Sequence, residues 1–194
     1  MPVVELVMSL LEADLKRVVR QFYAPRRTSD SGSWLEELPL MRGSVRADLV
    51  NIPDFHCFEI KSERDRLDRL VGQGVVYGAT FDRVTLVIAK KHLLDARNIV
   101  PDWWGILLLD QDGLIWHRRA AMNQGADRRA LASILSREEA VALLSEVGVK
   151  AANKTPLYAL HQAVAESIPV LRLRAYLKEA LPFRITDTAL ALPA

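Results

Sequence analysis

The chain has 194 residues, of which 50% are hydrophobic and 26% are charged, a composition typical of a folded globular protein rather than a disordered or fibrous one. Lys and Arg number 26 against 24 Asp and Glu, so the net charge of +2 excludes a broadly basic protein, and any attraction to nucleic acid must be local. The single cysteine, Cys57, excludes an internal disulfide and every zinc site that needs two thiolates. The sequence shows neither a secretory signal nor a membrane-length apolar run, so we expect a cytoplasmic protein.

Hydrophobic periodicity predicts an α/β core in the first two thirds of the chain. Apolar spacing over residues 3–23 predicts an amphipathic helix that Pro25 ends, and residues 26–33 read as a polar loop. Three strands are predicted after this loop, at 34–40, 44–52 and 55–62. A helix at 67–81, with an apolar stripe of Leu67, Leu70, Val71 and Val75, is followed by a strand at 84–89 and a short helix or turn at 90–98. A hairpin of 105–109 and 114–118 has its turn at Asp112-Gly113. The predicted order is therefore α-β-β-β-α-β followed by a hairpin.

After Arg119 the pattern indicates helices alone. Ser136 and Glu139 form a predicted capping box that opens a helix closing near Gly148. Thr155 is predicted as an N-cap with Pro156 in the first helical position, and a last helix is expected over 170–181. We therefore divide the chain into an α/β domain at 1–125 and an α-helical C-terminal extension at 126–194.

Three acidic residues are expected to form a row across the first three strands. Glu59 and Lys61 are two residues apart, so their side chains point to the same face of a strand. A two-residue turn at Pro53-Asp54 sets Asp48 opposite Glu59, and one at Arg42-Gly43 sets Glu37 opposite Asp48. Facing Cβ atoms lie about 5 Å apart, where like charges destabilise a sheet, so the row predicts a bound Mg²⁺ or Mn²⁺. An extra turn residue would slip the register and remove one side chain from this face.

Residues 34–119 resemble the PD-(D/E)xK nuclease superfamily, through Arg46-Ala-Asp48, Glu59-Ile-Lys61 and the Gln73 and Tyr77 of the following helix. The likeness is strongest to small stand-alone bacterial and phage-borne members of this superfamily, which share a late Trp-Gly strand, here Trp104-Gly105. The proline that names the motif is absent before Asp48. The resemblance implies a restriction-endonuclease-like core, with a mixed central sheet flanked by helices.

The resemblance also implies the roles of the site residues. Asp48 and Glu59 would bind metal, Lys61 would serve the attacking water, and Gln73 would support it. The upstream acidic ligand would be Glu37 or, on the first helix, Glu12. Arg69 and Tyr77 would contact the substrate, since a helix places them on one stripe with Gln73.

The function expected from these residues is metal-dependent hydrolysis of phosphodiester bonds in DNA. A homodimer would provide two active sites for a cut in both strands. Two other functions remain open: a non-catalytic DNA-binding or regulatory module that keeps the nuclease fold, and a protein-interaction adaptor that works through the helices after Ser136. The sequence leaves open whether the substrate is DNA or RNA, its strandedness, and a role in defence, repair or phage processing.

Overall fold

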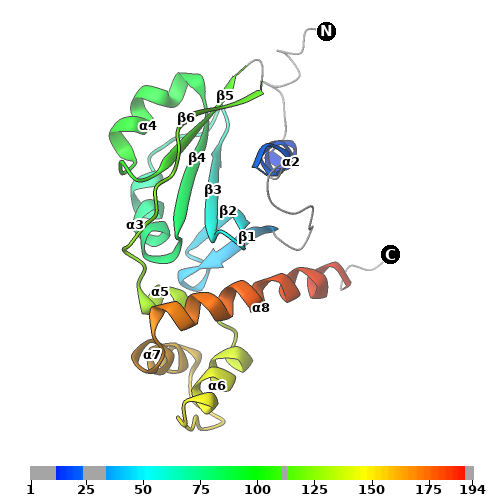
Figure 1. Ribbon diagram of the computed structural model, residues 1–194, viewed down its shortest axis with the longest axis vertical. Helices are drawn as coiled ribbons and strands as arrows, with labels where there is room; N and C mark the ends of the chain where they lie inside the picture. Colours follow the sequence, from blue (N-terminus) through cyan, green and yellow to red (C-terminus); the bar gives the residue numbers. More distant parts are fainter. Residues whose placement is uncertain (1–11, 24–33, 111–112, 191–194) are drawn as a thin grey trace.

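A computed structural model describes residues 12–23, 34–110 and 113–190 of the chain. The protein is mixed α/β: six strands lie side by side in chain order, with helices on both faces of the sheet and a group of helices below it (Figure 1). The predicted α-β-β-β-α-β order is confirmed, although this order alone does not confirm a restriction-endonuclease-like core. The elements are α2 (Glu12–Tyr23), β1 (Trp34–Leu40), η3 (Met41–Gly43), β2 (Val45–Asn51), β3 (His56–Lys61), α3 (Leu70–Thr80), β4 (Arg83–Ala89), η4 (Lys90–His92), α4 (Leu93–Ile99), β5 (Gly105–Asp110), β6 (Gly113–Arg118), α5 (Arg128–Ala132), α6 (Arg137–Glu146), α7 (Leu157–Ser167) and α8 (Val170–Leu190).

The first three strands form the predicted antiparallel meander, and their registers are those expected from two-residue turns. Glu36 pairs with Leu49 and Leu38 with Ala47, so the β1–β2 register is the expected one, although Glu37 itself is not among the paired residues. The last β2–β3 pair is Leu49 with Phe58, so Asp48 and Glu59 lie one position beyond the paired residues. Strands β3, β4 and β5 are parallel, because α3 and α4 return the chain between them. β6 is the antiparallel hairpin partner of β5 at the edge of the sheet. Of the predicted turn at Asp112-Gly113, Asp112 lies outside the described residues, and Gly113, with a φ of 113°, begins β6.

The two faces of the sheet carry separate hydrophobic clusters. On one face, Leu15 and Val19 of α2 pack against Phe58 and Ile60. On the other face, α3 and the helices after residue 127 share one larger cluster with the inward side chains of the sheet. Strand alternation separates Phe58 and Ile60 from Glu59, as predicted, so Glu59 points toward α3. The N-terminal part of the predicted first helix, residues 3–11, and the predicted loop at 26–33 lie outside the described residues.

Helix α3 differs from the prediction in its start and in its buried face. It begins at Leu70 rather than Leu67, and although Leu70 is buried, Val71 and Val75 are 65% and 73% exposed. The glycines let other side chains approach, because a Cβ on Gly74 would lie 3.5 Å from the Trp104 ring. The helix therefore packs through Leu70, Tyr77 and its glycine side, and Val71 and Val75 face outward.

The C-terminal helices confirm the Ser136–Glu139 capping box and correct two boundaries. Pro156 has an extended backbone and is itself the N-cap of α7, so Thr155 lies one residue outside the cap. α8 continues through Pro182 to Leu190 instead of ending at Leu181. Residues on both sides of the proline anchor this helix, since Leu181 is buried in the core and the Arg184 guanidinium pairs with Glu139.

Buried ion pairs attach α8 to the sheet. The Asp82 carboxylate, at the start of β4, lies 2.9 Å from the Arg174 guanidinium and 3.3 Å from Lys178 Nζ. The hydrophobic cluster also continues from the sheet into α5–α8, so the two predicted domains share a core, and their boundary at residue 125 stays a prediction. No helix within the described ranges is long and apolar enough to cross a membrane.

Candidate functional site

The Glu59 carboxylate is fully buried between β3 and α3, and hydrogen-bond donors occupy both of its oxygens. Oε1 accepts from Lys61 Nζ and, at 2.8 Å, from Gln73 Nε2, and Oε2 accepts from the Tyr77 hydroxyl at 2.6 Å. A buried charge is costly unless it is paired and hydrogen-bonded, and this carboxylate meets both conditions. The structure thus brings Glu59, Lys61, Gln73 and Tyr77 together as predicted, in a network that ties β3 to α3.

Asp48 takes part in a different contact. Its Oδ2 accepts the backbone N–H of Ile60 at 2.8 Å, beyond the last β2–β3 pair at Leu49 and Phe58. The side chain therefore satisfies a strand amide at the point where the two strands stop pairing. Asp48 lies beside Glu59, and one of its oxygens already has a structural partner.

The protonation states of Lys61 and Tyr77 keep both groups as hydrogen-bond donors to Glu59. Burial tends to lower the pKa of Lys61, but the charge and hydrogen bond of Glu59, with Asp48 and Asp65 adding to them, raise it above its ordinary value. The pKa of Tyr77 is raised strongly, first by burial and then by the charge and hydrogen bond of Glu59. Both groups hold their protons at neutral pH and remain donors to Glu59. An ammonium whose pKa is raised does not take a proton from water.

Glu37 of β1 and Lys16 of α2 form a separate ion pair. Lys16 is buried, and its Nζ lies 2.5 Å from Glu37 Oε1, while Arg46 Nε lies 3.7 Å from Glu37 Oε2. Glu37 also has a backbone φ of 53°, which turns it out of the regular strand. Its carboxylate is thus held by cations, and the side chain of Glu12, the other predicted upstream ligand, lies outside the described residues.

The acidic row does not fit a divalent metal in this arrangement. A cation at Glu59 would have to displace Lys61, Gln73 and Tyr77, the donors that neutralise and satisfy this carboxylate. Within residues 12–23, 34–110 and 113–190, no group of three or more His, Cys, Asp or Glu side chains is arranged to hold a metal ion. A site at Glu37, Asp48 and Glu59 for Mg²⁺ or Mn²⁺ stays a prediction, and no chemical step is built on it.

Exposed cations surround the strand ends beside Glu59. Arg46, Arg64, Arg69 and Lys91 are exposed, and we call these four residues the basic edge. The segments that carry them meet here, because Lys61 pairs with Ile88 at the ends of β3 and β4, and His92 Nε2 lies 3.2 Å from the Glu63 carbonyl oxygen. Arg69, predicted to contact substrate, lies on this edge and does not reach the Glu59 network.

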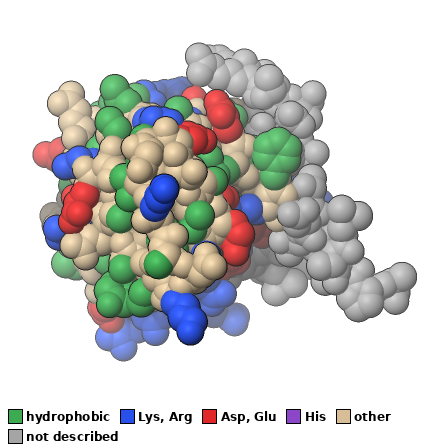
Figure 2. Space-filling model, turned by 90° about the horizontal axis from the view of Figure 1, so that it is seen from below, with side chains coloured by type: hydrophobic (Ala, Val, Ile, Leu, Met, Phe, Trp, Pro, Cys, Tyr) green, Lys and Arg blue, Asp and Glu red, His purple; other side chains and the backbone are tan. Residues whose placement is uncertain are grey.

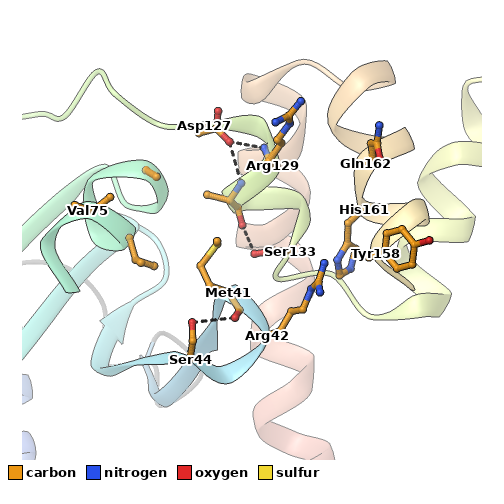
Figure 3. Close-up of a pocket in the computed structure, with 13 residues that line it drawn as sticks. Met41, Arg42, Ser44, Val75, Asp127, Arg129, Ser133, Tyr158, His161 and Gln162 are labelled. Carbon is orange, nitrogen blue, oxygen red and sulfur yellow. Dashed lines mark hydrogen bonds between the residues drawn. The ribbon is translucent and has the colours of Figure 1, made fainter. Parts of the chain in front are cut away.

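A groove between α3 and α7 has no counterpart in the sequence prediction. It has a volume of about 780 Å³, and the residues that matter most in it are Met41, Arg42, Val75, Arg129, Tyr158 and Gln162 (Figure 3). No sequence motif marks these positions. The signal that was available was Arg42-Gly43, which indicated a tight turn without showing what the turn presents.

A buried polar chain lies on the opposite face of β3. The Tyr23 hydroxyl donates to Asp54 at 2.8 Å, and the His56 ring contacts Tyr23 at 3.2 Å and Thr85 at 2.8 Å through its two nitrogens. Burial, with a contribution from Arg83, lowers the pKa of His56 to about 3. His56 is therefore neutral in the folded protein and ties α2 to β3 and β4.

Comparison with known proteins identifies a phage family. The profile of the family described as "Bacteriophage P4 protein cII" matches residues 7–189. Protein cII of Enterobacteria phage P4 is 28% identical over 99 residues, which cover 50% of this chain and 38% of that relative. The match thus spans well under two thirds of the relative. No solved structure matches the chain.

These findings correct the assignment to the PD-(D/E)xK superfamily, because the matching family is cII and no nuclease family matches. The prediction of a Mg²⁺-dependent deoxyribonuclease, and with it of an endonuclease or hydrolase, is wrong for the same reason. The misleading signal has a physical origin: the Asp48 and Glu59-x-Lys61 pattern also suits a buried carboxylate with a neighbouring ammonium, which here serves packing. Of the expected likeness to phage-borne nucleases, only the connection to a phage protein is supported. The chain belongs to the bacteriophage P4 protein cII family.

Proposed function

We propose that this chain is a non-catalytic regulatory module that binds DNA through the basic edge. The observation that carries the proposal is the contrast at the carboxyl ends of β3 and β4. There a fully satisfied carboxylate, Glu59, lies beneath exposed cations. A protein that binds DNA without cutting it can act only by covering the site it binds. For this reason we propose a regulatory role.

The near absence of ion pairs at the basic edge supports binding to phosphates. Arg64, Arg69 and Lys91 form no ion pair with any residue that the structure describes, and Arg46 has only the 3.7 Å contact to Glu37. Two acidic residues of the same loop are already engaged, since Asp68 pairs with Arg66 at 2.8 Å and Asp65 accepts the Ser62 amide at 2.6 Å. Unpaired guanidinium and ammonium groups are the usual contacts to the DNA backbone.

A local distribution of charge accounts for DNA binding by a chain with a net charge of only +2. The face seen from below, where the C-terminal helices lie, carries both Lys or Arg and Asp or Glu side chains around its rim (Figure 2), whereas the basic edge, at the carboxyl ends of β3 and β4, exposes four cations. Phosphate binding depends on such local groups more than on the total charge.

The test is the affinity of the full chain for a short labelled duplex, measured by fluorescence anisotropy over a series of salt concentrations. We expect the affinity to fall with salt, and the double variant Arg64→Ala/Arg69→Ala to lower the slope of log Kd against log salt by about 2, or roughly 0.9 per lost phosphate contact. The matched control, Lys150→Ala/Lys154→Ala, removes two exposed cations from the α6–α7 loop and should leave the slope unchanged. Equal effects of the two pairs, or affinity that ignores salt, would refute the proposal.

A further inference from the structure

The groove between α3, η3, α5 and α7 combines apolar walls with exposed cations, and we call it the α3–α7 groove. Its walls expose large apolar side chains: Val75 is 73% exposed, Tyr158 57% and Met41 48%. Val71, one turn before Val75, extends the apolar strip along α3. Contiguous exposed apolar surface of this kind marks sites of protein association.

Two guanidinium groups flank the groove without an acidic partner. Neither Arg42 nor Arg129 forms an ion pair with another described residue, and Arg42 lies 5.9 Å from the Tyr158 ring centroid, beside His161 (Figure 3). The one carboxylate in the lining, Asp127, accepts the backbone N–H groups of Arg129 and Ala130 as the N-cap of α5. The groove therefore offers unbalanced positive charge next to an apolar surface.

The backbone holds two of these side chains in a rare conformation. Met41 and Arg42 have φ values of 47° and 60°, a region that non-glycine residues seldom occupy. Ser44 Oγ donates to the Met41 carbonyl at 3.0 Å and so fixes the turn. Consecutive residues of this kind are costly and tend to occur where a side chain must be presented in one direction. Here they present Met41 and Arg42 to the groove.

We propose that the α3–α7 groove binds an acidic amphipathic peptide segment of a partner protein. Apolar side chains of the segment pack on Val75, Met41 and Tyr158. Its carboxylates pair with Arg42 and Arg129, which have no acidic partner among the described residues. This is the arrangement by which an amphipathic helix lies in a groove with apolar anchors one turn apart.

The composition of the groove favours a peptide over nucleic acid. Much of its lining is aliphatic, and of its two rings Tyr158 lies beneath the Arg42 guanidinium while the His161 imidazole is buried. Single-stranded nucleic acid uses stacked aromatic platforms and a continuous track of cations, which two separate arginines do not provide. The groove shares none of its lining with the basic edge, so this proposal and DNA binding can fail independently.

The test is a selection from a displayed library of random peptides of about 16 residues, roughly four helical turns, against the full chain. We expect enriched peptides to combine Asp or Glu with apolar residues at helical spacing. Synthesised versions should bind the Val75→Asp variant and the Arg42→Glu/Arg129→Glu variant about tenfold or more weakly. The control is Leu94→Asp on α4, because Leu94 is exposed to the same 73% as Val75 and lies outside the groove. It should retain the affinity.

Circular dichroism melts of each variant separate loss of binding from loss of folding. If Val75→Asp does not fold, the arginine variant alone decides, since both of its side chains are exposed. The proposal is overturned if no peptide is enriched, if the enriched peptides are basic or lack apolar residues, or if folded groove variants bind them as well as the wild type. It is also overturned if light scattering shows self-association that Val75→Asp abolishes, because a second copy would then occupy the groove.

Discussion

The Glu59 network and the α3–α7 groove are built from opposite sides of one helix. Gln73 and Tyr77 of α3 turn inward and satisfy a buried carboxylate, whereas Val75, between them in sequence, faces out into the groove. In the network every charge has a partner, while in the groove the two arginines have no acidic partner among the described residues and large apolar side chains are exposed. The residue types associated with catalysis therefore stabilise the fold here. The exposed surface suited to binding a partner is the α3–α7 groove, which no sequence motif marks.

The largest expected effect tests whether Glu59 is structural. Glu59→Ala should lower the free energy of unfolding by about 3–5 kcal/mol, because it removes the buried partner of Lys61 and the carboxylate that accepts from Gln73 and Tyr77. Urea denaturation measures it, with Glu179→Ala on α8, an exposed position, as the control that should change stability by about 0.5 kcal/mol or less. A Glu59→Ala protein as stable as the wild type would mean that the carboxylate is kept for chemistry instead.

A smaller effect is expected when one donor is removed from the same network. Tyr77→Phe leaves Glu59 Oε2 buried without the hydrogen bond it now accepts at 2.6 Å, which should cost about 1–3 kcal/mol. The cost should shrink in the Glu59→Ala background, because the hydroxyl then has no carboxylate to satisfy. Additive losses in the double variant would show that the hydroxyl acts through the Arg46 carbonyl, which it also contacts at 2.9 Å, rather than through Glu59.

The buried character of β3 also predicts a pH dependence through His56. Its pKa is about 3 in the folded protein and near 6.5 in the unfolded chain, so below pH 6.5 the unfolded state binds the proton and folding is disfavoured. Stability should be full above about pH 6.5 and fall by up to about 1.4 kcal/mol per pH unit toward pH 3. Urea melts at several pH values measure the slope. His56→Gln should reduce it, and His117→Gln, at an exposed position, should not.

The smallest stability effect is expected in the groove. Val75→Asp changes a side chain that is 73% exposed, so thermal melts should show a change of about 0.5 kcal/mol or less, even though peptide binding is lost. Val75→Asp should thus abolish peptide binding with little effect on stability, whereas Glu59→Ala should mainly lower stability. A strongly destabilised Val75→Asp protein would place Val75 in the packed core and remove the contrast.

Much of the α/β core follows from local sequence signals. Turn pairs at Arg42-Gly43 and Pro53-Asp54 give the correct registers, and strand alternation correctly places Glu59 and Lys61 on one face. The capping box at Ser136 fixes the start of α6 because its hydrogen bonds are local. These features depend on neighbours in the chain, which a sequence displays directly.

Features that depend on distant contacts could not be predicted in this way. Val71 and Val75 have the spacing of a buried stripe, but the glycine side of α3 packs against Trp104 and turns the valines outward. The continuation of α8 past Pro182 relies on the pairing of Arg184 with Glu139, remote in sequence. The nuclease assignment failed for a different reason: the sequence grouped Glu59, Lys61, Gln73 and Tyr77 but could not show that Lys61, Gln73 and Tyr77 all donate to the buried carboxylate.

The most direct test of the central claim asks whether DNA bound by this protein stays intact. Labelled single-stranded and duplex DNA is incubated with the full chain in Mg²⁺ and in Mn²⁺, complex formation is followed by anisotropy, and the DNA is then extracted and sized on a denaturing gel. The account predicts salt-sensitive complexes and full-length DNA, with Asp48→Asn and Lys61→Ala giving the same gel pattern as the wild type. Metal-dependent fragments that both substitutions abolish would contradict it.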